Sequence, residues 1–230
     1  MHLDHVSYAT GVEHLADTVQ RIGASLGATF ADGGLHPKFG TRNFILPLAG
    51  GMYVEVVAAL EHPAAYEAPF GQAVRRRAEA GGGWIGWVVG TSDMAAVERR
   101  LGRPAAEGHR IRPDGFDLRW AQIGVRDTMA DPQLPYFVNW HIDAEHHPSA
   151  GANGVRISEL EIAGDAGRVS QWLGEPQTHP LDDVEVRWLD PNEGPGLVAV
   201  TFDTANGISV GMDPHGDRPV TRRADPRTIA

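Results

Sequence analysis

The chain contains no cysteine, and this single absence removes several functions at once. Without thiols there is no disulfide framework, no thiolate metal site and no cysteine nucleophile. Any metal ion would therefore have to be held by histidine, aspartate, glutamate or neutral oxygen ligands.

Long apolar runs and an excess of positive charge are also missing. The first residues, MHLDHVSYATG, hold no basic region followed by an apolar run, and no stretch approaches a membrane-spanning length. The formal net charge is −10, which argues against nucleic acid or an anionic membrane surface as the main partner. We expect a cytoplasmic protein.

Glycine and proline, by contrast, are abundant, with 28 and 16 residues among 230. Apolar residues make up 42% and charged residues 22%, which are ordinary values for a globular protein that is long enough to bury a core. The glycines and prolines indicate many turns and short strands.

The first segment reads as a strand, a helix and two or three further strands. Residues 3–10 alternate as a strand does, and apolar residues of 12–26 recur at helical spacing before Gly27, which would end the helix. Strands are predicted at 41–46 and 52–58, and a weaker one at 29–31.

Two later segments repeat this order. The second begins with WIGWVVGT, continues with a helix from Asp93, a plausible N-cap, and has strands at 116–123 and 136–142. The third begins with RISELEIAG. All three predicted helices end in Leu-Gly, at 26–27, 101–102 and 173–174. Strand-helix-strand order is common in α/β proteins, but these shared endings favour a true repeat.

The repeat defines the predicted domains. Residues 1–60 and 81–143 are two βαβββ modules that pair within a domain of residues 1–150. Residues 151–212 form a third, partial module, and residues 213–230 form a polar, proline-rich tail. The segment EHPAAYEAPFG is a linker between the first two modules. Since two modules complete one unit, the third either packs against them or pairs with a second copy in a homodimer.

One face of each strand should pack on the helices, and the other should line a concave surface. In the first module the second face carries polar residues, and in the second module we place Phe137 and Asn139 on it, with Val138 and Trp140 outward. Such a surface is typical of a small-molecule pocket. The polar residues expected there in the first module are His5, Ser7, Thr41, Asn43, Tyr53 and Glu55.

Each of these residues also has a simpler interpretation. A single His5 or Glu55 on a strand is commonly a surface residue or a hydrogen-bonded core residue. His36, followed by proline, could hold a turn, and Thr41 and Asn43 could either bind a ligand or cap the loop. Arg119, on a predicted strand of the concave sheet, could neutralise an anionic substrate.

Several short motifs resemble the glyoxalase-like branch of the vicinal-oxygen-chelate superfamily. They are LDHV at 3–6, HPKFGTRN at 36–43, PL at 47–48, YVEVV at 53–57, LPYFVNW at 134–140 and HP at 147–148. HPKFGTRN followed by YVEVV is fairly specific, and the resemblance covers residues 1–210. It implies an α+β fold in which repeated βαβββ modules form a cupped, barrel-like mixed sheet with helices on the outside.

The resemblance also implies a chemistry. In metal-dependent relatives, the first and last strand of each module supply ligands to a divalent ion such as zinc, nickel, manganese or iron, which acts as a Lewis acid. His5 and Glu55 match two of the four ligand positions, and Gly86 and Asn139 fall at the others. Glycine has no side chain and Asn139 is a poor ligand, so the implied site is incomplete. A third ligand could come from one of four histidines: His36, His141, His146 and His147.

The sequence therefore favours an enzyme that acts on a small oxygen-rich organic molecule, with metal assistance as an option. His5 and Glu55 are the expected catalytic residues: Glu55 is a metal ligand or general base, and His5 a ligand or proton carrier. His36, Thr41, Asn43, Arg119 and Asn139 are the expected substrate-binding residues. The alternative is a non-catalytic protein of the same fold that sequesters or senses a small molecule.

Overall fold

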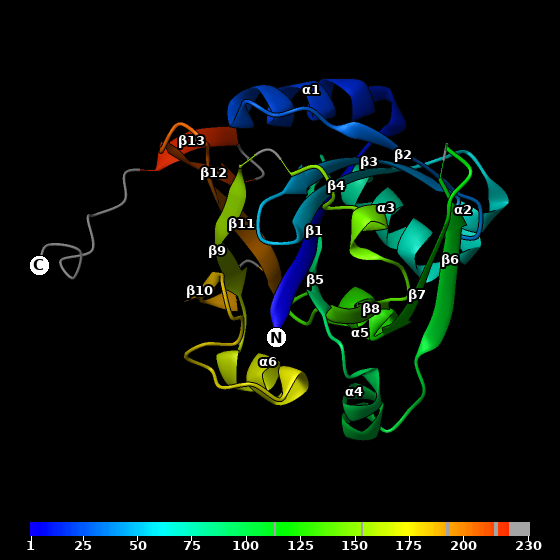
Figure 1. Ribbon diagram of the computed structural model, residues 1–230, viewed down its shortest axis with the longest axis vertical. Coiled ribbons are helices and arrows are strands. Elements are labelled where there is room, and N and C mark those ends of the chain that lie inside the picture. The colour runs from blue at the N-terminus through cyan, green and yellow to red at the C-terminus, as the bar shows by residue number, and fades with distance from the viewer. Residues whose placement is uncertain (113, 153, 192–193, 214–215, 221–230) are drawn as a thin grey trace, which may run out of the picture.

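The computed structural model describes residues 1–112, 114–152, 154–191, 194–213 and 216–220. Its larger part is an eight-stranded mixed sheet with the strand order β2-β3-β4-β1-β5-β8-β7-β6 (Figure 1). The strands are β1 His2–Thr10, β2 Ala31–His36, β3 Thr41–Leu48, β4 Met52–Ala59, β5 Gly83–Gly90, β6 Ala106–Ile111, β7 Asp117–Ile123 and β8 Tyr136–Trp140.

The two halves of this sheet have the same pairing. In the first half β1 is parallel to β4, β4 antiparallel to β3, and β3 antiparallel to β2. In the second half β5, β8, β7 and β6 pair in the same way. The halves join through the antiparallel pair β1 and β5. The predicted α+β fold of βαβββ modules in a cupped, barrel-like sheet is confirmed.

The helices that follow the first strand of each segment end as the sequence predicts. Gly27, Gly102 and Gly174 have φ of 63°, 67° and 71°, a left-handed conformation that glycine adopts without a Cβ clash. Asp93 caps its helix by accepting a hydrogen bond from the Ala96 amide. The helices are α1 Leu15–Leu26, α2 Pro63–Glu67, α3 Pro69–Glu79, α4 Met94–Leu101, α5 Val125–Ala130 and α6 Ala166–Leu173, with short 3₁₀ turns at Val12–His14 and Ala144–His146.

The third segment forms a separate five-stranded sheet in the order β10-β9-β11-β12-β13. Its strands are β9 Arg156–Ala163, β10 Glu185–Leu189, β11 Gly196–Asp203, β12 Ser209–Asp213 and β13 Gly216–Val220. It shares the strand-helix-strand beginning of the modules, but β9 is parallel to the next strand, β10, and antiparallel to β11. Residues 216–220, expected in the polar tail, form edge strand β13, and residues 221–230 lie outside the described residues.

The second sheet packs on the outer face of the first. Figure 1 shows it, in yellow-green to red, beside β1 and β5, while the other strands of the first sheet curve away on the opposite side. Trp84 on β5 lies against Phe202 on β11, and its indole donates a hydrogen bond to the Met212 carbonyl at 2.9 Å. One apolar core therefore runs through both sheets, so the third segment packs against the first two within the same chain.

The segment predicted as a linker between the modules is in fact helical. Pro63 and Pro69 stand in the first turns of α2 and α3, where a missing N–H costs nothing. Helix α3 packs on the concave face of the first sheet, where Val74 meets Ala9 and Val57. It therefore closes one end of the cup, a tertiary role that a proline-rich stretch does not reveal.

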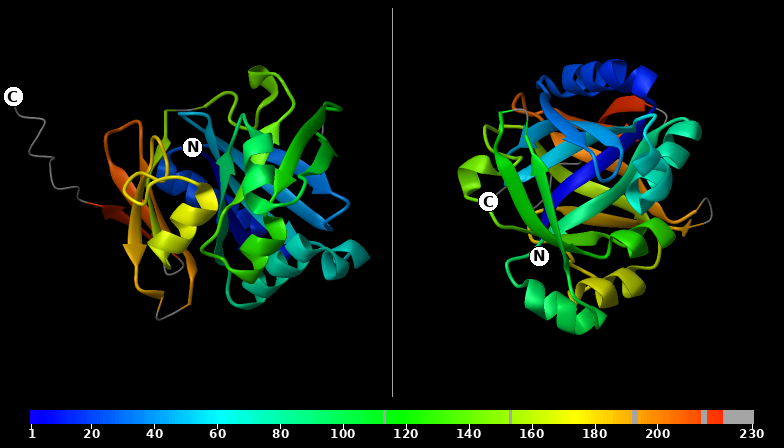
Figure 2. Two further views of the ribbon diagram at one scale, coloured as in Figure 1. Left: turned by 90° about the horizontal axis from the view of Figure 1, so that it is seen from below. Right: turned by 90° about the vertical axis from the view of Figure 1, so that its right-hand side faces the viewer.

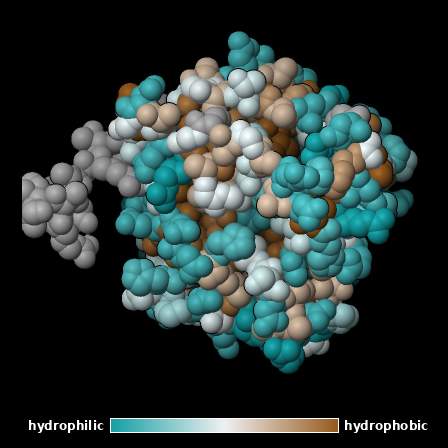
Figure 3. All heavy atoms as spheres, viewed as in Figure 1, coloured by the Kyte–Doolittle hydropathy of each residue, from teal (hydrophilic) through white to brown (hydrophobic). Residues whose placement is uncertain are grey.

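The cup is nearly closed because its two edge strands, β2 and β6, approach each other (Figure 2). The face of the molecule in Figure 3 is mainly hydrophilic, with hydrophobic residues seen in the recesses between hydrophilic ones. Within the described residues, no helix is long and apolar enough to cross a membrane.

Candidate active site

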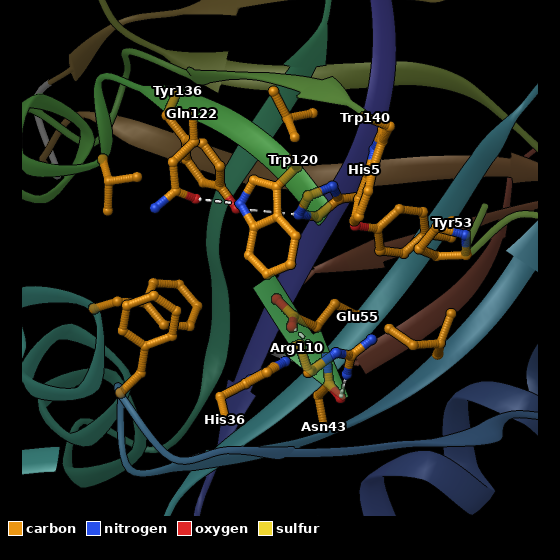
Figure 4. Close-up of a pocket in the computed structure, with 16 residues that line it drawn as sticks. His5, His36, Asn43, Tyr53, Glu55, Arg110, Trp120, Gln122, Tyr136 and Trp140 are labelled. Atoms are coloured by element: carbon orange, nitrogen blue, oxygen red, sulfur yellow. Dashed lines mark hydrogen bonds between the residues drawn. The ribbon is translucent and has the colours of Figure 1, made fainter. Parts of the chain in front are cut away.

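A pocket that is partly open to solvent lies on the concave side of the first sheet (Figure 4). Both modules contribute residues to it, and α3 and the loop after β2 form one end of it. Its lining residues are His5, His36, Phe39, Asn43, Ile45, Tyr53, Glu55, Phe70, Arg110, Trp120, Gln122, Val125, Tyr136, Val138, Trp140 and Pro148.

Glu55 is a buried carboxylate whose two oxygens both have partners. Ser7 Oγ donates to Oε2 at 2.7 Å, and Asn43 Nδ2 donates to Oε1 at 2.6 Å. Burial would raise the pKa of Glu55, but His36, His5 and these two hydrogen bonds outweigh it and lower the pKa. Glu55 is therefore a fixed negative charge in the pocket and a weak base.

Arg110 connects this carboxylate to the opposite edge of the sheet. Its guanidinium, on β6, donates a hydrogen bond to Asn43 Oδ1 at 3.0 Å and another to the Gly33 carbonyl on β2. Gly33 is required there because a Cβ would collide with Asn43 Oδ1. The chain from Arg110 through Asn43 to Glu55 thus spans the gap between β2 and β6.

His36 lies beside this chain at the end of β2. Its Nδ1 is 3.0 Å from Thr41 Oγ1, and the residue is half-buried. Burial lowers the pKa of His36 to about 4, with Glu55 partly opposing the effect. At neutral pH the imidazole is therefore uncharged, with one nitrogen bonded to Thr41.

His5 forms the second polar centre of the pocket. Its Nδ1 is 2.6 Å from Asp4 Oδ1, and its Nε2 is 3.3 Å from the Tyr136 hydroxyl. An ionised carboxylate can only accept, so Asp4 fixes the proton on Nδ1 and leaves Nε2 as the acceptor facing Tyr136. The ring also stacks on Tyr53, with centroids 4.3 Å apart.

Asp4 is fully buried behind this histidine. The pairing of β1 with β5 shifts register between Leu3 and His5, which allows Asp4 and His5 to meet although they are adjacent in a strand. Trp140 Nε1 donates to Asp4 Oδ2 at 2.9 Å, and His147 Nε2 is 3.3 Å from it. Burial would raise the pKa of Asp4, but His147 and His5 hold it well below its usual range.

Two tyrosines of the pocket stay protonated. Burial, with further contributions from Glu55 and Asp4, raises the pKa of Tyr136 well above its usual value. Burial and Asp4 do the same for Tyr53. The Tyr136 hydroxyl is therefore a neutral hydrogen-bond donor next to His5.

The structure brings most of the sequence-predicted residues together. The concave face expected for the first module is confirmed: His5, Asn43, Tyr53 and Glu55 line the pocket, while Val54 and Val56 lie in the core. His36 also lines the pocket. Thr41 is buried and holds His36 rather than lining the pocket itself.

In the second module the expected face is wrong. Val138 and Trp140 line the pocket with Tyr136, whereas Phe137 is fully buried in the core and Asn139 lies outside the lining. Both faces of strand YFVNW carry an aromatic residue, and its polar amide, Asn139, lies on the face turned away from the pocket. Alternation alone therefore does not determine which face is concave. Arg119 also lies outside the pocket: its side chain is 67% exposed and pairs with Asp117.

Asp4, Arg110 and Tyr136 are polar residues of the site that the sequence did not indicate. Asp4 carried one signal, since a carboxylate within an apolar strand requires a partner when buried. Arg110 lies in AEGHRI, which shows neither apolar alternation nor β-branched enrichment, and strand β6 was not predicted. Of the proposed extra histidine ligands, His147 contacts Asp4, while His146 stacks on Phe116.

The site does not fit the divalent metal that the fold family often uses. Both nitrogens of His5 and both oxygens of Glu55 already have hydrogen-bond partners. The second module presents Tyr136 and Trp140 to the pocket in place of further ligands. Among the described residues, no group of three histidine or acidic side chains could hold a metal ion, whereas three protein ligands are usual for catalytic zinc.

Solved structures of similar fold include methylmalonyl-CoA epimerases. The enzyme from Mycobacterium tuberculosis is 15% identical over 60% of this chain and 86% of its own, with a TM-score of 0.40. A variant of the Streptomyces coelicolor enzyme is 18% identical over 61% and 96%, with a TM-score of 0.41. No curated protein matches the chain. At these sequence identities and TM-scores, the similarity indicates neither the substrate nor the activity of this chain.

The family itself follows from sequence and fold together. A profile of the glyoxalase-like domain matches residues 3–177, which include both modules, the helical linker and the beginning of the third segment. The paired βαβββ modules with a pocket inside their cup have the architecture of the vicinal-oxygen-chelate superfamily. The chain is a member of the glyoxalase-like domain family of that superfamily.

Proposed function

We propose that this protein is a glyoxalase-like enzyme that moves a proton on a small oxygen-rich molecule, with His5 as the acid and base. The main evidence is the pair of contacts made by His5: Nδ1 is 2.6 Å from Asp4 and Nε2 is 3.3 Å from Tyr136 at the pocket wall. A buried carboxylate that orients an imidazole, with the other nitrogen facing a pocket, is the arrangement that general-base catalysis requires.

The groups around His5 support proton transfer at a carbon atom next to a carbonyl group. His5 Nε2 would take the proton from that carbon, and the carbonyl oxygen would gain negative charge as the enolate forms. The protonated Tyr136 hydroxyl lies 3.3 Å from Nε2 and would donate a hydrogen bond to this oxygen. His5 would return the proton to the same carbon or to its neighbour, so the reaction is an isomerisation or epimerisation and needs no co-reactant.

Glu55 has a different role in this proposal than the sequence indicated. Its oxygens accept hydrogen bonds from Ser7 and Asn43, and its lowered pKa makes it a poor proton acceptor. It would orient the substrate by accepting a hydrogen bond. A metal-assisted mechanism has no support from the residues of the pocket, because the two expected ligands, His5 and Glu55, already form hydrogen bonds with other residues.

Deuterium exchange tests the proposal. A panel of carbonyl compounds that carry an α-hydroxyl or α-methylene group is incubated with the protein in deuterium oxide and followed by NMR. Incorporation by the wild type should fall about a hundredfold or more in His5→Gln, the range of a lost general base. Incorporation no faster than in buffer for every compound, or unchanged in His5→Gln, would rule out the proposal.

The non-catalytic alternative predicts a different result in the same samples. A sequestering or sensing protein would bind members of the panel without exchanging their protons, and its affinity would depend on the pocket aromatics. The cytoplasmic location and the homodimer stay predictions from the sequence, and light scattering on the purified protein tests the second.

A further inference from the structure

We infer that the pocket selects an uncharged carbonyl compound that carries a flat aromatic ring with a hydroxyl group. The ring would lie between the aromatic walls, and the hydroxyl would donate a hydrogen bond to Glu55. This inference names the substrate class of the same site and so rests on the proposed function. It follows from three properties of the pocket, namely its walls, its acceptor and its charge balance.

The walls are unusually aromatic for this chain. Six of the sixteen lining residues are phenylalanine, tyrosine or tryptophan, whereas these types make up 7% of the whole sequence. They come from both modules, from the loop after β2 and from α3. A flat ring gains offset-stacked or edge-to-face contacts with such walls beyond the burial of its area. The six are Phe39, Tyr53, Phe70, Trp120, Tyr136 and Trp140.

Hydrogen bonds hold several of these rings in place before a ligand arrives. Trp120 Nε1 donates to Gln122 Oε1 at 2.8 Å, and Trp140 Nε1 donates to Asp4 at 2.9 Å. The two indoles lie 5.4 Å apart between centroids. Walls fixed in this way lose little conformational freedom on binding, which favours a rigid flat ring over a flexible chain.

The polar end of the pocket lies apart from most of these rings. Figure 4 shows Glu55, Asn43, Arg110 and His36 together, with Trp120 and Tyr136 on the other side. Each Glu55 oxygen accepts one hydrogen bond from the protein and has capacity for another. Because an ionised carboxylate only accepts, the ligand group that meets it must be a donor.

The charge balance indicates that this donor is a hydroxyl rather than an ammonium group. Arg110 and Glu55 both form hydrogen bonds with Asn43, and the positive charge of Arg110 interacts with the negative charge of Glu55. The second carboxylate, Asp4, is occupied by His5, Trp140 and His147. No surplus negative charge is left in the pocket to stabilise an organic cation, and Glu55 would repel an anion. An uncharged donor meets both conditions.

Isothermal titration calorimetry of the whole chain with four non-reacting probes tests this inference. Phenol has the ring and the hydroxyl, cyclohexanol lacks the aromatic ring, benzoate carries a negative charge and benzylammonium a positive one. Phenol should bind about tenfold more tightly than each of the other three, and Trp120→Leu should remove its advantage over cyclohexanol. Glu55→Gln should weaken the binding of phenol by a similar factor and strengthen the binding of benzoate.

Trp188→Leu is the matched control, because Trp188 is a partly buried tryptophan on β10 in the second sheet, outside the pocket. Its four affinities should equal those of the wild type. Equal binding of phenol and cyclohexanol, tighter binding of either ion, or no binding of any probe would overturn the inference. These titrations involve no turnover. If the protein binds phenol selectively but exchanges no substrate protons for deuterium, the result would therefore count against the proposed reaction alone.

Discussion

Arg110 and Asn43 are joined by a hydrogen bond of 3.0 Å, although Arg110 lies on the last strand of the eight-stranded order and Asn43 on the second. The carboxylate of Glu55 accepts from Asn43 Nδ2, which leaves Oδ1 to accept from Arg110, so both ends of the amide are determined by their partners. The cup is thereby held together at its open side by side chains of the pocket.

Asn43→Asp should destabilise the protein by about 2 kcal/mol. The substitution replaces a donor to Glu55 with a second carboxylate, so a buried hydrogen bond is lost and two like charges face each other. Urea denaturation at neutral pH measures the free energy of unfolding. Asn139→Asp, at a half-buried asparagine outside the pocket, is the control. Equal losses in the two variants would contradict the role of Asn43.

Arg110→Met should loosen the two sheet edges without unfolding the cup. Loss of the bonds to Gly33 and Asn43 would raise amide hydrogen exchange about tenfold in peptides that cover 31–36 and 106–111. Exchange in 52–59, which lies between two paired strands, should not change. Arg119→Met removes an exposed arginine from the next strand and should leave all three peptides as they were.

His36 should make stability depend on pH. Its pKa is about 4 in the folded protein against 6.5 for an ordinary histidine, so the unfolded chain binds more protons between these values. The contribution of His36 to the free energy of unfolding is therefore fully present above pH 6.5 and falls by about 3 kcal/mol as the pH drops toward 4. His36→Asn should flatten this part of the curve of unfolding free energy against pH. His14→Asn, at an exposed histidine, should leave the slope unchanged.

Asp4→Asn should lower proton exchange about a hundredfold while phenol affinity stays within about twofold. The carboxylate fixes the His5 tautomer from behind the pocket and does not line it. An amide in its place can present its NH₂ group to Nδ1 and thereby favour the wrong tautomer. The pH profile of exchange should shift as well, which a merely structural loss would not cause. Asp114→Asn, at an exposed aspartate, serves as the control.

Added zinc, nickel, manganese or iron(II) should change neither the melting temperature nor the exchange rate. The reason is the donor set, in which His5 and Glu55 are hydrogen-bonded and no third ligand joins them among the described residues. Metal analysis of the purified protein is the direct measurement. Stoichiometric metal that is lost in both His5→Ala and Glu55→Ala would restore the metal-dependent mechanism and contradict this prediction.

The modules and half of the pocket can be predicted from the sequence alone. Alternation places His5, Asn43 and Glu55 on one face of their strands because the opposite face of each strand is clearly apolar. The Leu-Gly endings mark the helix ends because left-handed residues favour glycine. These features are local, so they can be read from neighbouring residues.

The rest of the site depends on how the strands pair and curve in the folded chain. Both faces of strand β8 carry aromatic residues, so which face is concave depends on its pairing with β5 and β7. Arg110 reaches Asn43 only because the sheet curves until its edges meet, and Asp4 meets Trp140 and His147 through contacts more than a hundred residues apart. Such contacts depend on curvature and register summed over many strands, which no single segment of sequence specifies.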